Sequence, residues 1–268
     1  MNRIRIESPQ IQSFEIEHIA AVRRLAPECM VLLENDGTLP LKGAGKLALY
    51  GSGARRTIKG GTGSGDVNVR HFVTVEEGLK NAGFEITTQS WLDRYDQVVE
   101  DARKAFYGAV RKEAEAAGLT GSRLAMYAMG RTCPEPEYEL PLDGEGDMAA
   151  YILARNSGEG SDRKPVAGDI NLTETEIRDI LALNEKYDKF VLVLNVGGMI
   201  DLKPVKAVKT VLLMGQLGSA TGDALSDVLL GKASPSGKLT MTWAPIKDYP
   251  STEGFGDPND TYYKEGIY

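Results

Sequence analysis

Short runs of apolar residues recur along this chain of 268 residues, and they constrain its fold more than any other feature. The runs span 46–51, 149–154, 190–196 and 208–214. Within them apolar side chains follow one another instead of alternating with polar ones, which is typical of strands that are covered on both faces. Stretches with helical periodicity separate the runs. This order predicts the α/β class, with a three-layer α/β/α sandwich around a mostly parallel sheet of about six strands.

Local signals predict the remaining elements. Thr173 and Glu176 have the spacing of a capping box, so a helix should begin there. Pro27 should kink or restart a helix expected over 16–35, because proline lacks the amide hydrogen and crowds the preceding turn. Other helices are expected over 75–82, 91–117 and 220–230, and other strands over 84–88 and 238–243. We therefore divide the chain into an N-terminal helix and lead-in segment (1–45), the α/β sandwich (46–245) and an irregular tail (246–268).

The composition narrows the classes of function. The 31 basic and 38 acidic side chains give a net charge of −7, which argues against nucleic acid and anionic membranes as partners. No stretch reaches the ~18 apolar residues that a membrane-spanning helix needs. Two cysteines, Cys29 and Cys133, are too few for a disulfide framework or a four-sulfur zinc site. The N-terminal stretch lacks the apolar core of a signal peptide, so a cytoplasmic location is expected.

A glycine-rich segment, 59–68, follows the first apolar run and holds four glycines in six positions. Ligands of parallel α/β sheets bind beyond the carboxyl ends of the strands, which is where this segment should lie. It contains neither the G-x-x-x-x-G-K-[ST] nor the G-x-G-x-x-G pattern of a phosphate cradle. Two interpretations remain open: a site for a neutral, hydroxyl-rich ligand, or a purely structural turn.

A second loop, 155–163, follows the strand expected over 149–154. Glu159 stands between two glycines, so its carboxyl can project from the loop without a bulky neighbour beside it. A glutamate placed in this way can act as a general acid or base if burial raises its pKa toward neutrality. The alternative is an ordinary solvated acid. Asp162 and Arg163 could form a local ion pair that fixes the loop.

Five segments of the chain resemble one known family. These segments are 30–41, 59–68, 156–164, 193–202 and 224–243, and they occur in the order that the family has. The family is glycoside hydrolase family three, which includes many β-glucosidases, and the resemblance is to its α/β-sandwich domain. The resemblance covers the chain from about residue 17 to its end.

The resemblance implies a retaining glycosidase that acts on β-linked oligosaccharides or glucosides with two catalytic carboxylates and no metal or organic cofactor. Residues 157–163 match the motif Ser-Gly-Glu-Gly-x-Asp-Arg, which in the family carries the acid/base glutamate. Glu159 inherits that role, and Asp162 and Arg163 inherit the positioning of the loop. In the glycine-rich segment, Ser64 is the first choice for contacting a sugar hydroxyl, with Thr62 and Asp66 as further candidates.

The nucleophile of the family is an aspartate on a separate TIM-barrel domain, which would be the partner of this chain. A barrel takes about 250 residues by itself, so 268 residues cannot hold both domains. We therefore expect a truncated chain or one half of a split enzyme, from a member with reversed domain order, and an isolated chain without activity. Two alternatives are a carbohydrate-binding module without catalysis and a doubly wound ligand-binding module.

Overall fold

The computed structural model describes residues 10–128, 131, 133–157, 163–245 and 248. Its centre is a six-stranded sheet in the order β1-β6-β5-β4-β2-β3. The strands are β1 (Val31–Glu34), β2 (Lys46–Tyr50), β3 (Glu85–Ile86), β4 (Met148–Arg155), β5 (Lys189–Val196) and β6 (Val211–Leu213). β1 runs antiparallel to β6, and all other neighbours are parallel. The predicted α/β class and the mostly parallel sheet are confirmed.

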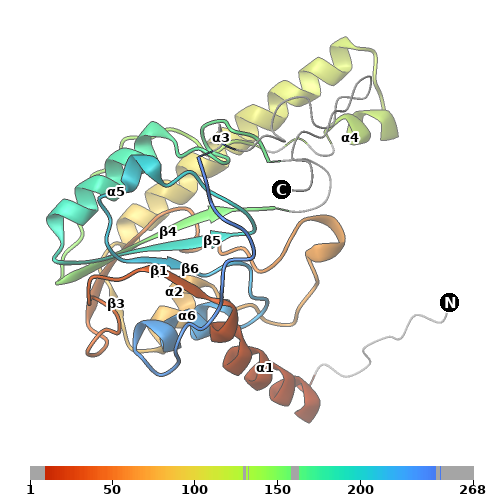
Figure 1. The fold of residues 1–268 in the computed structure, drawn as a ribbon. Helices are drawn as coiled ribbons and strands as arrows, with labels where there is room; N and C mark the ends of the chain where they lie inside the picture. The colour runs from red at the N-terminus through yellow and green to blue at the C-terminus, as the bar shows by residue number, and fades with distance from the viewer. Residues whose placement is uncertain (1–9, 129–130, 132, 158–162, 246–247, 249–268) are drawn as a thin grey trace.

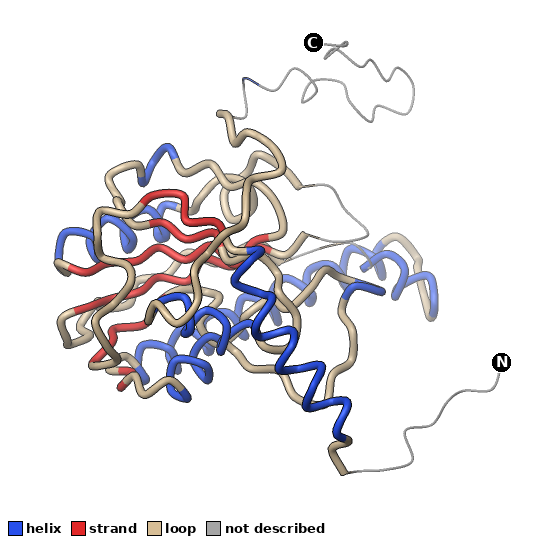
Figure 2. The backbone as a smooth tube through the Cα atoms, turned by 60° about the horizontal axis from the view of Figure 1, so that its bottom comes forward, coloured by secondary structure: helices blue, strands red, loops and turns tan. Residues whose placement is uncertain are grey.

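Helices cover both faces of the sheet (Figures 1 and 2). α2 (Val75–Asn81) and α6 (Thr221–Leu229) lie on one face, and α3 (Gln89–Ala116) and α5 (Glu174–Lys186) lie on the other. Right-handed crossovers explain this division, because the chain moves outward from β2 to β3 through α2 and returns to β4 through α3. α1 (Ser13–Leu25) extends from the α6 side, and α4 (Ser122–Ala128) packs on the far end of α3. No helix in the described residues is long and apolar enough to cross a membrane.

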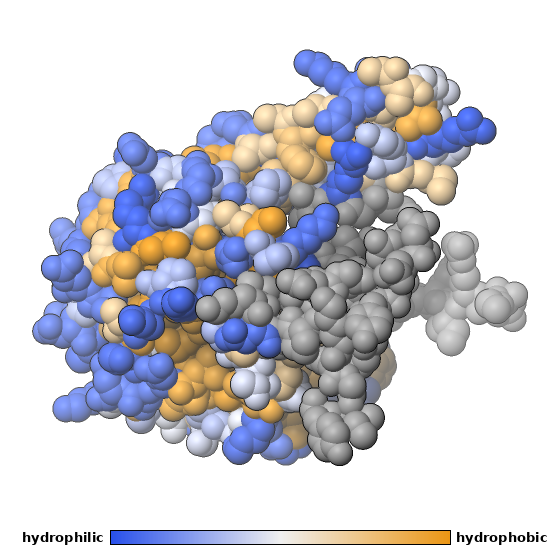
Figure 3. Space-filling model, turned by 45° about the horizontal axis from the view of Figure 1, so that its top comes forward, coloured by the Kyte–Doolittle hydropathy of each residue, from blue (hydrophilic) through white to orange (hydrophobic). Residues whose placement is uncertain are grey.

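The central strands form the core. Every residue of 47–50 and 190–196 is buried, as the continuous apolar runs predict. On the α3 face, the Trp91 ring stacks on Tyr95 at a centroid distance of 5.2 Å and meets Tyr50 edge-on at 5.1 Å. The predicted capping box also forms, since the hydroxyl of Thr173 accepts from the Glu176 amide and the Glu176 carboxylate accepts from the Thr173 amide. The second half of α3 leaves this core and projects with α4 as an arm (Figure 3).

α2 and α6 cross at two glycines. A Cβ atom at Gly78 would lie 2.0 Å from the carbonyl carbon of Gly222, and one at Gly222 would lie 1.9 Å from the carbonyl oxygen of Thr74. Side chains at these positions would therefore force the helices apart. The amide of Gly222 also donates to the carbonyl of Val73 at 3.0 Å, so the first turns of the two helices lie side by side.

Two sequence-based expectations are wrong. Residues 31–34 form β1 instead of continuing a helix, because α1 ends at Leu25, a 3-10 turn over Ala26–Cys29 that contains Pro27 follows it, and the extended segment pairs with β6. Residues 238–243 form no strand, although their apolar content fits one. The outer side of β6 is already occupied by β1, and most of 238–242 is exposed. The sheet therefore reaches six strands with a different member from the one expected.

Candidate active site

The parallel strands β2, β4, β5 and β6 end at the same edge of the sheet, and the two loops singled out above leave from this edge. The glycine-rich segment 59–68 lies in the connection between β2 and α2, and the name glycine-rich loop is used for 59–72. The loop expected over 155–163 follows β4, which ends at Arg155, and the name carboxylate loop is used for 156–164. Two further segments at this edge, 197–198 after β5 and 214–219 after β6, lie beside them. The topology thus brings together loops that are about a hundred residues apart in the sequence.

The glycine-rich loop is held at both ends by the segment after β6. The amide of Gly218 donates to the carbonyl of Lys59 at 2.8 Å, and the amide of Val73 donates to the carbonyl of Ser219 at 2.9 Å. Its glycines serve close packing and tight turning: a Cβ atom at Gly60 would lie 2.6 Å from the carbonyl oxygen of Gly65, and Gly63 has a φ of 62°. The loop therefore has a defined conformation, and backbone hydrogen bonds fix both of its ends.

Three residues of this loop are predicted to contact a sugar. Thr62 and Asp66 are exposed, and the carboxylate of Asp66 pairs with the ammonium of Lys59 across the loop. Ser64 lies in the 3-10 turn Gly63–Gly65, and its side chain lies outside what the structure describes. Exposure of Thr62 and Asp66 leaves room for a ligand, but their role as sugar contacts stays a prediction.

The carboxylate loop is tied down by charged groups. Glu159 and Asp162 themselves lie outside the described residues. Before them, the buried Arg155 donates to both carboxylate oxygens of Glu176, at 2.7 and 2.5 Å, and to the carbonyl of Asp169 at 3.1 Å. Because Glu176 is fully buried and Arg155 nearly so, this pair is shielded from solvent.

The end of the same loop is anchored on Asp169. Its carboxylate pairs with the Arg163 guanidinium and accepts from the Lys164 amide at 2.6 Å. Arg163 also donates to the hydroxyl of Ser157 at 2.9 Å, which joins the end of the loop to its beginning. Arg163 therefore has described partners that suit the positioning role predicted for it, and Asp169 is a partner that the sequence did not reveal.

The amide side chains of Gln216 and Asn195 connect the two loops to β5 and to the segment after β6. The side-chain amide nitrogen of Gln216, which lies after β6, donates to the side-chain oxygen of Asn156 at 3.3 Å. Gly197 leaves space for this contact, since a Cβ atom there would lie 2.9 Å from both Gln216 Oε1 and Ser157 Cβ. On β5, Asn195 is fully buried and bonded to the backbone of Ile58, just before the glycine-rich loop. A signal for Asn195 exists in the sequence: an amide inside an apolar run must find partners when it is buried.

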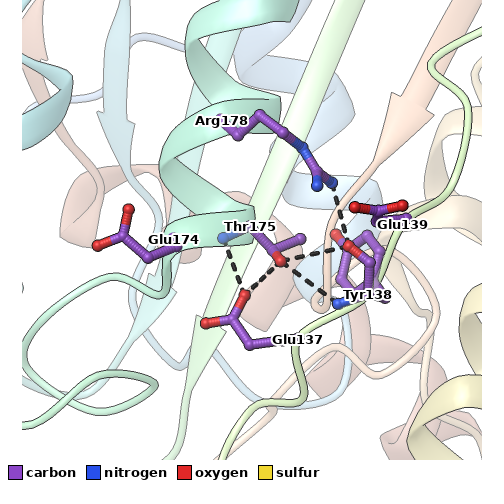
Figure 4. A pocket seen from close by; sticks show the side chains of 6 residues that line it. All are labelled: Glu137, Tyr138, Glu139, Glu174, Thr175 and Arg178. Carbon is purple, nitrogen blue, oxygen red and sulfur yellow. Dashed lines mark hydrogen bonds between the residues drawn. The ribbon is translucent and has the colours of Figure 1, made fainter.

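A pocket elsewhere on the molecule is lined by Glu137, Tyr138, Glu139, Glu174, Thr175 and Arg178 (Figure 4). Its polar groups bind one another. The carboxylate of Glu137 accepts from the Thr175 amide at 3.0 Å, and Arg178 donates to the carbonyl of Tyr138 at 3.2 Å. These bonds fasten the segment 137–139 to the first turns of α5, and none of the predicted site residues that the structure describes lines the pocket. Among the described residues, no group of three or more His, Cys, Asp or Glu could hold a metal ion.

Comparisons with known proteins agree with one another. A family model described as "Glycosyl hydrolase family 3 C-terminal domain" matches residues 30–268. Beta-glucosidase A of Butyrivibrio fibrisolvens is 33% identical over 94% of this chain and 32% of its own length. A Beta-glucosidase of Ruminococcus albus is 30% identical over 94% of this chain and 26% of its own length. The chain thus spans about a third, or less, of the length of these relatives.

A solved structure shows the same fold. Beta-glucosidase 3B from Thermotoga neapolitana, in complex with alpha-D-glucose, superposes with a TM-score of 0.72 at 30% sequence identity. The match covers 93% of this chain and 34% of that one. A beta-glucosidase from Paenibacillus barengoltzii gives a TM-score of 0.69 at 26% identity, over 90% of this chain. The whole described sandwich is therefore similar to one part of much longer proteins.

Proposed function

The chain belongs to glycosyl hydrolase family 3 as a domain of the C-terminal type, and from this premise we propose that it is the domain of a retaining β-glucosidase that supplies the acid/base Glu159. The observation that carries the proposal is the anchoring of the Glu159 loop by Arg155 and Arg163 at the carboxyl edge of the sheet, beside the glycine-rich loop. The names of the relatives and the structural neighbour with bound glucose support the substrate class.

In the proposed reaction a β-glucoside lies between this domain and a second domain that carries an aspartate nucleophile. Glu159 protonates the leaving oxygen while the aspartate attacks the anomeric carbon, and two such carboxyl groups stand ~5–5.5 Å apart in retaining enzymes. Glu159 then takes a proton from the water that releases the sugar. Ser64, with Thr62 and Asp66, contacts sugar hydroxyls from the glycine-rich loop.

The anchors of the carboxylate loop support this role for physical reasons. A general acid contributes only when it is held within reach of the atom that it protonates. Arg163 joins Asp169 to Ser157, so the two ends of the Glu159 loop are tied to each other and to the sheet edge. A solvated loop acid would need no such anchoring.

The deciding experiment replaces Glu159 by alanine in the complete enzyme, meaning this chain together with the barrel domain that the proposal requires. Glycosides with poor leaving groups should lose about 10²–10⁴-fold in rate, since they need protonation. Activated aryl glycosides should lose far less in the first step, and azide should restore turnover because it attacks without a general base. Equal losses for both substrates without azide rescue would assign Glu159 a structural role.

Glu145 offers a matched control within the same chain. It also stands between two glycines and is exposed, but it precedes β4 instead of following it. Glu145→Ala should therefore leave both rates unchanged. This chain alone, without the nucleophile, should release no nitrophenol from a nitrophenyl glucoside, and clear turnover would contradict the division of the catalytic groups between two domains.

A further inference from the structure

We propose that Asn195, on the buried strand β5, is a positioning residue that sets where the glycine-rich loop stands relative to the carboxylate loop. The proposal rests on the proposed function, because it assigns those two loops to one active site. Asn195 is fully buried among apolar residues of β5, where an amide without partners would be costly. Its three bonds all go to backbone groups of the segments that carry or support the loops.

The amide of Asn195 joins three segments. Its oxygen accepts from the Ile58 amide at 2.6 Å, and its nitrogen donates to the carbonyl of Ile58 at 3.0 Å. The same nitrogen donates to the carbonyl of Gly215 at 2.6 Å. The side chain thus bonds to both backbone groups of Ile58, as a neighbouring strand would. It thereby fixes the position and orientation of the backbone just before Lys59, where the loop begins.

The contacts continue from Asn195 to the carboxylate loop. The next residue after Gly215 is Gln216, whose amide binds Asn156 at the start of that loop. Two residues further on, the amide of Gly218 binds the carbonyl of Lys59. A shift of the segment after β6 would therefore move the base of one loop and a contact of the other. Asn195 bonds both to this segment and to Ile58, so it fixes the position of one loop relative to the other.

Two substitutions in the complete enzyme test this inference. Asn195→Leu removes every bond of the amide, and Asn195→Asp keeps the shape and an acceptor for Ile58 but loses both donors. A displaced glycine-rich loop should weaken substrate binding while Glu159 still protonates, so KM should rise about tenfold and kcat should change by less than about threefold. Hydrogen exchange at the Ile58 amide should accelerate in Asn195→Leu and stay closer to the parent in Asn195→Asp.

This split distinguishes positioning from a general loss of stability. A variant with fewer folded molecules shows a lower apparent kcat and an unchanged KM. Thr88→Val is the matched control, since the buried Thr88 hydroxyl also makes two bonds to backbone, accepting from the Leu49 amide at 2.9 Å and donating to its carbonyl at 2.5 Å. Thr88→Val should lower stability and leave KM unchanged.

The outcomes separate the two levels of the proposal. If both Asn195 variants keep the parent KM, or if Thr88→Val raises KM equally, Asn195 is an ordinary buried amide and the inference is overturned. If the parent enzyme hydrolyses no β-glucoside, the proposed function fails, and hydrogen exchange at Ile58 still decides whether Asn195 holds the loop. Unchanged exchange at Ile58 in Asn195→Leu overturns the inference whatever the activity.

Discussion

The two loops at the carboxyl edge of the sheet are held by different chemistry. The base of the glycine-rich loop is fixed by neutral hydrogen bonds, from Asn195 to Ile58 and from Gly218 to Lys59. The carboxylate loop is fixed by ion pairs, Arg155 with Glu176 and Arg163 with Asp169. Neutral bonds carry no net charge for salt to screen, whereas salt weakens the partly exposed pair of Arg163 with Asp169 more than the buried pair of Arg155 with Glu176. The loop that carries the proposed acid/base is thus the one whose anchors are charged.

The largest expected effect comes from breaking the buried pair. Glu176→Gln keeps the shape and the capping acceptor of the side chain but leaves the Arg155 guanidinium buried without its counterion. We expect the free energy of unfolding to fall by about 3–5 kcal/mol, measured by urea denaturation. The double variant Arg155→Met with Glu176→Gln should regain part of this loss. A single variant as stable as the parent would show that the charged anchoring contributes nothing.

The second effect is a pH dependence of stability, and it arises from the charged groups around Arg155 and Glu176. Burial and the nearby Glu176 carboxylate raise the pKa of Glu135 to about 7. Its carboxyl accepts from the Tyr95 hydroxyl, and the Arg155 and Arg56 guanidinium groups lie close enough to oppose the rise of this pKa. Below about pH 4.3 the carboxyl is protonated in both the folded and the unfolded chain.

As the pH rises from about 4.3 to 7, the unfolded chain loses this proton and the folded chain keeps it, so the contribution of Glu135 to stability falls by about 4 kcal/mol. Glu135→Gln removes this titration. The stability of the variant relative to the parent should therefore increase with pH across that window and stay constant above it. Chemical denaturation of both proteins at pH 4.5, 6 and 7.5 measures the difference, and a flat difference would contradict the prediction.

A third variant contrasts the two kinds of anchor in catalysis. Asp169→Asn removes the charge that holds Arg163 at the end of the carboxylate loop. In the complete enzyme we expect kcat to fall about tenfold for poor leaving groups and much less for activated aryl glycosides, with KM nearly unchanged; fewer folded molecules would lower kcat equally for both, and Asn195→Leu should instead raise KM. Steady-state kinetics of the two variants side by side make the measurement. If both shift the same constant, the two anchors do not act on separate loops.

The smallest effect concerns the one ion pair described within the glycine-rich loop. The carboxylate of Asp66, which pairs with Lys59, is mostly exposed, so solvent screens the interaction. Lys59→Met should change the free energy of unfolding by less than about 1 kcal/mol, and the change should vanish in high salt. A loss well above this value, or one that persists in molar salt, would mean that this loop also depends on charge.

Much of the fold is predictable because its signals are local. The apolar runs 46–51 and 190–196 become buried parallel strands, and the capping box marks the start of α5. Residues 31–34 and 238–243 both hold apolar residues that a strand could bury, yet the first stretch pairs with β6 and the second does not. Only the order of strands in the sheet decides between them, and that order depends on contacts between residues that are far apart in the sequence.

The candidate site shows the same limit. Glu145 and Glu159 have the same glycine neighbours, and what separates them is that one precedes β4 and the other follows it. That difference can be inferred from the sequence once the strand is placed. The partner Asn195 is harder to find, because its hydrogen bond to Ile58 joins residues that are 137 positions apart in the chain. Asp169 follows the carboxylate loop, but no sequence pattern marks it as the partner of Arg163. The glycine-rich segment turns tightly and Thr62 and Asp66 on it are exposed, and which of its two interpretations holds stays a prediction.

The glycine contact between α2 and α6 has a consequence for motion. The glycine-rich loop leads into α2, and the segment 214–219 leads into α6. With Gly78 against Gly222 the two helix backbones are in direct contact, so we expect a displacement of one helix to displace the other. We therefore expect α2 and α6 to move as one unit, together with the segments 59–74 and 214–220 that lead into them at the edge of the site. Any opening or closing of that edge must then be a joint displacement of both segments, seen as correlated relaxation in residues 59–74 and 214–222.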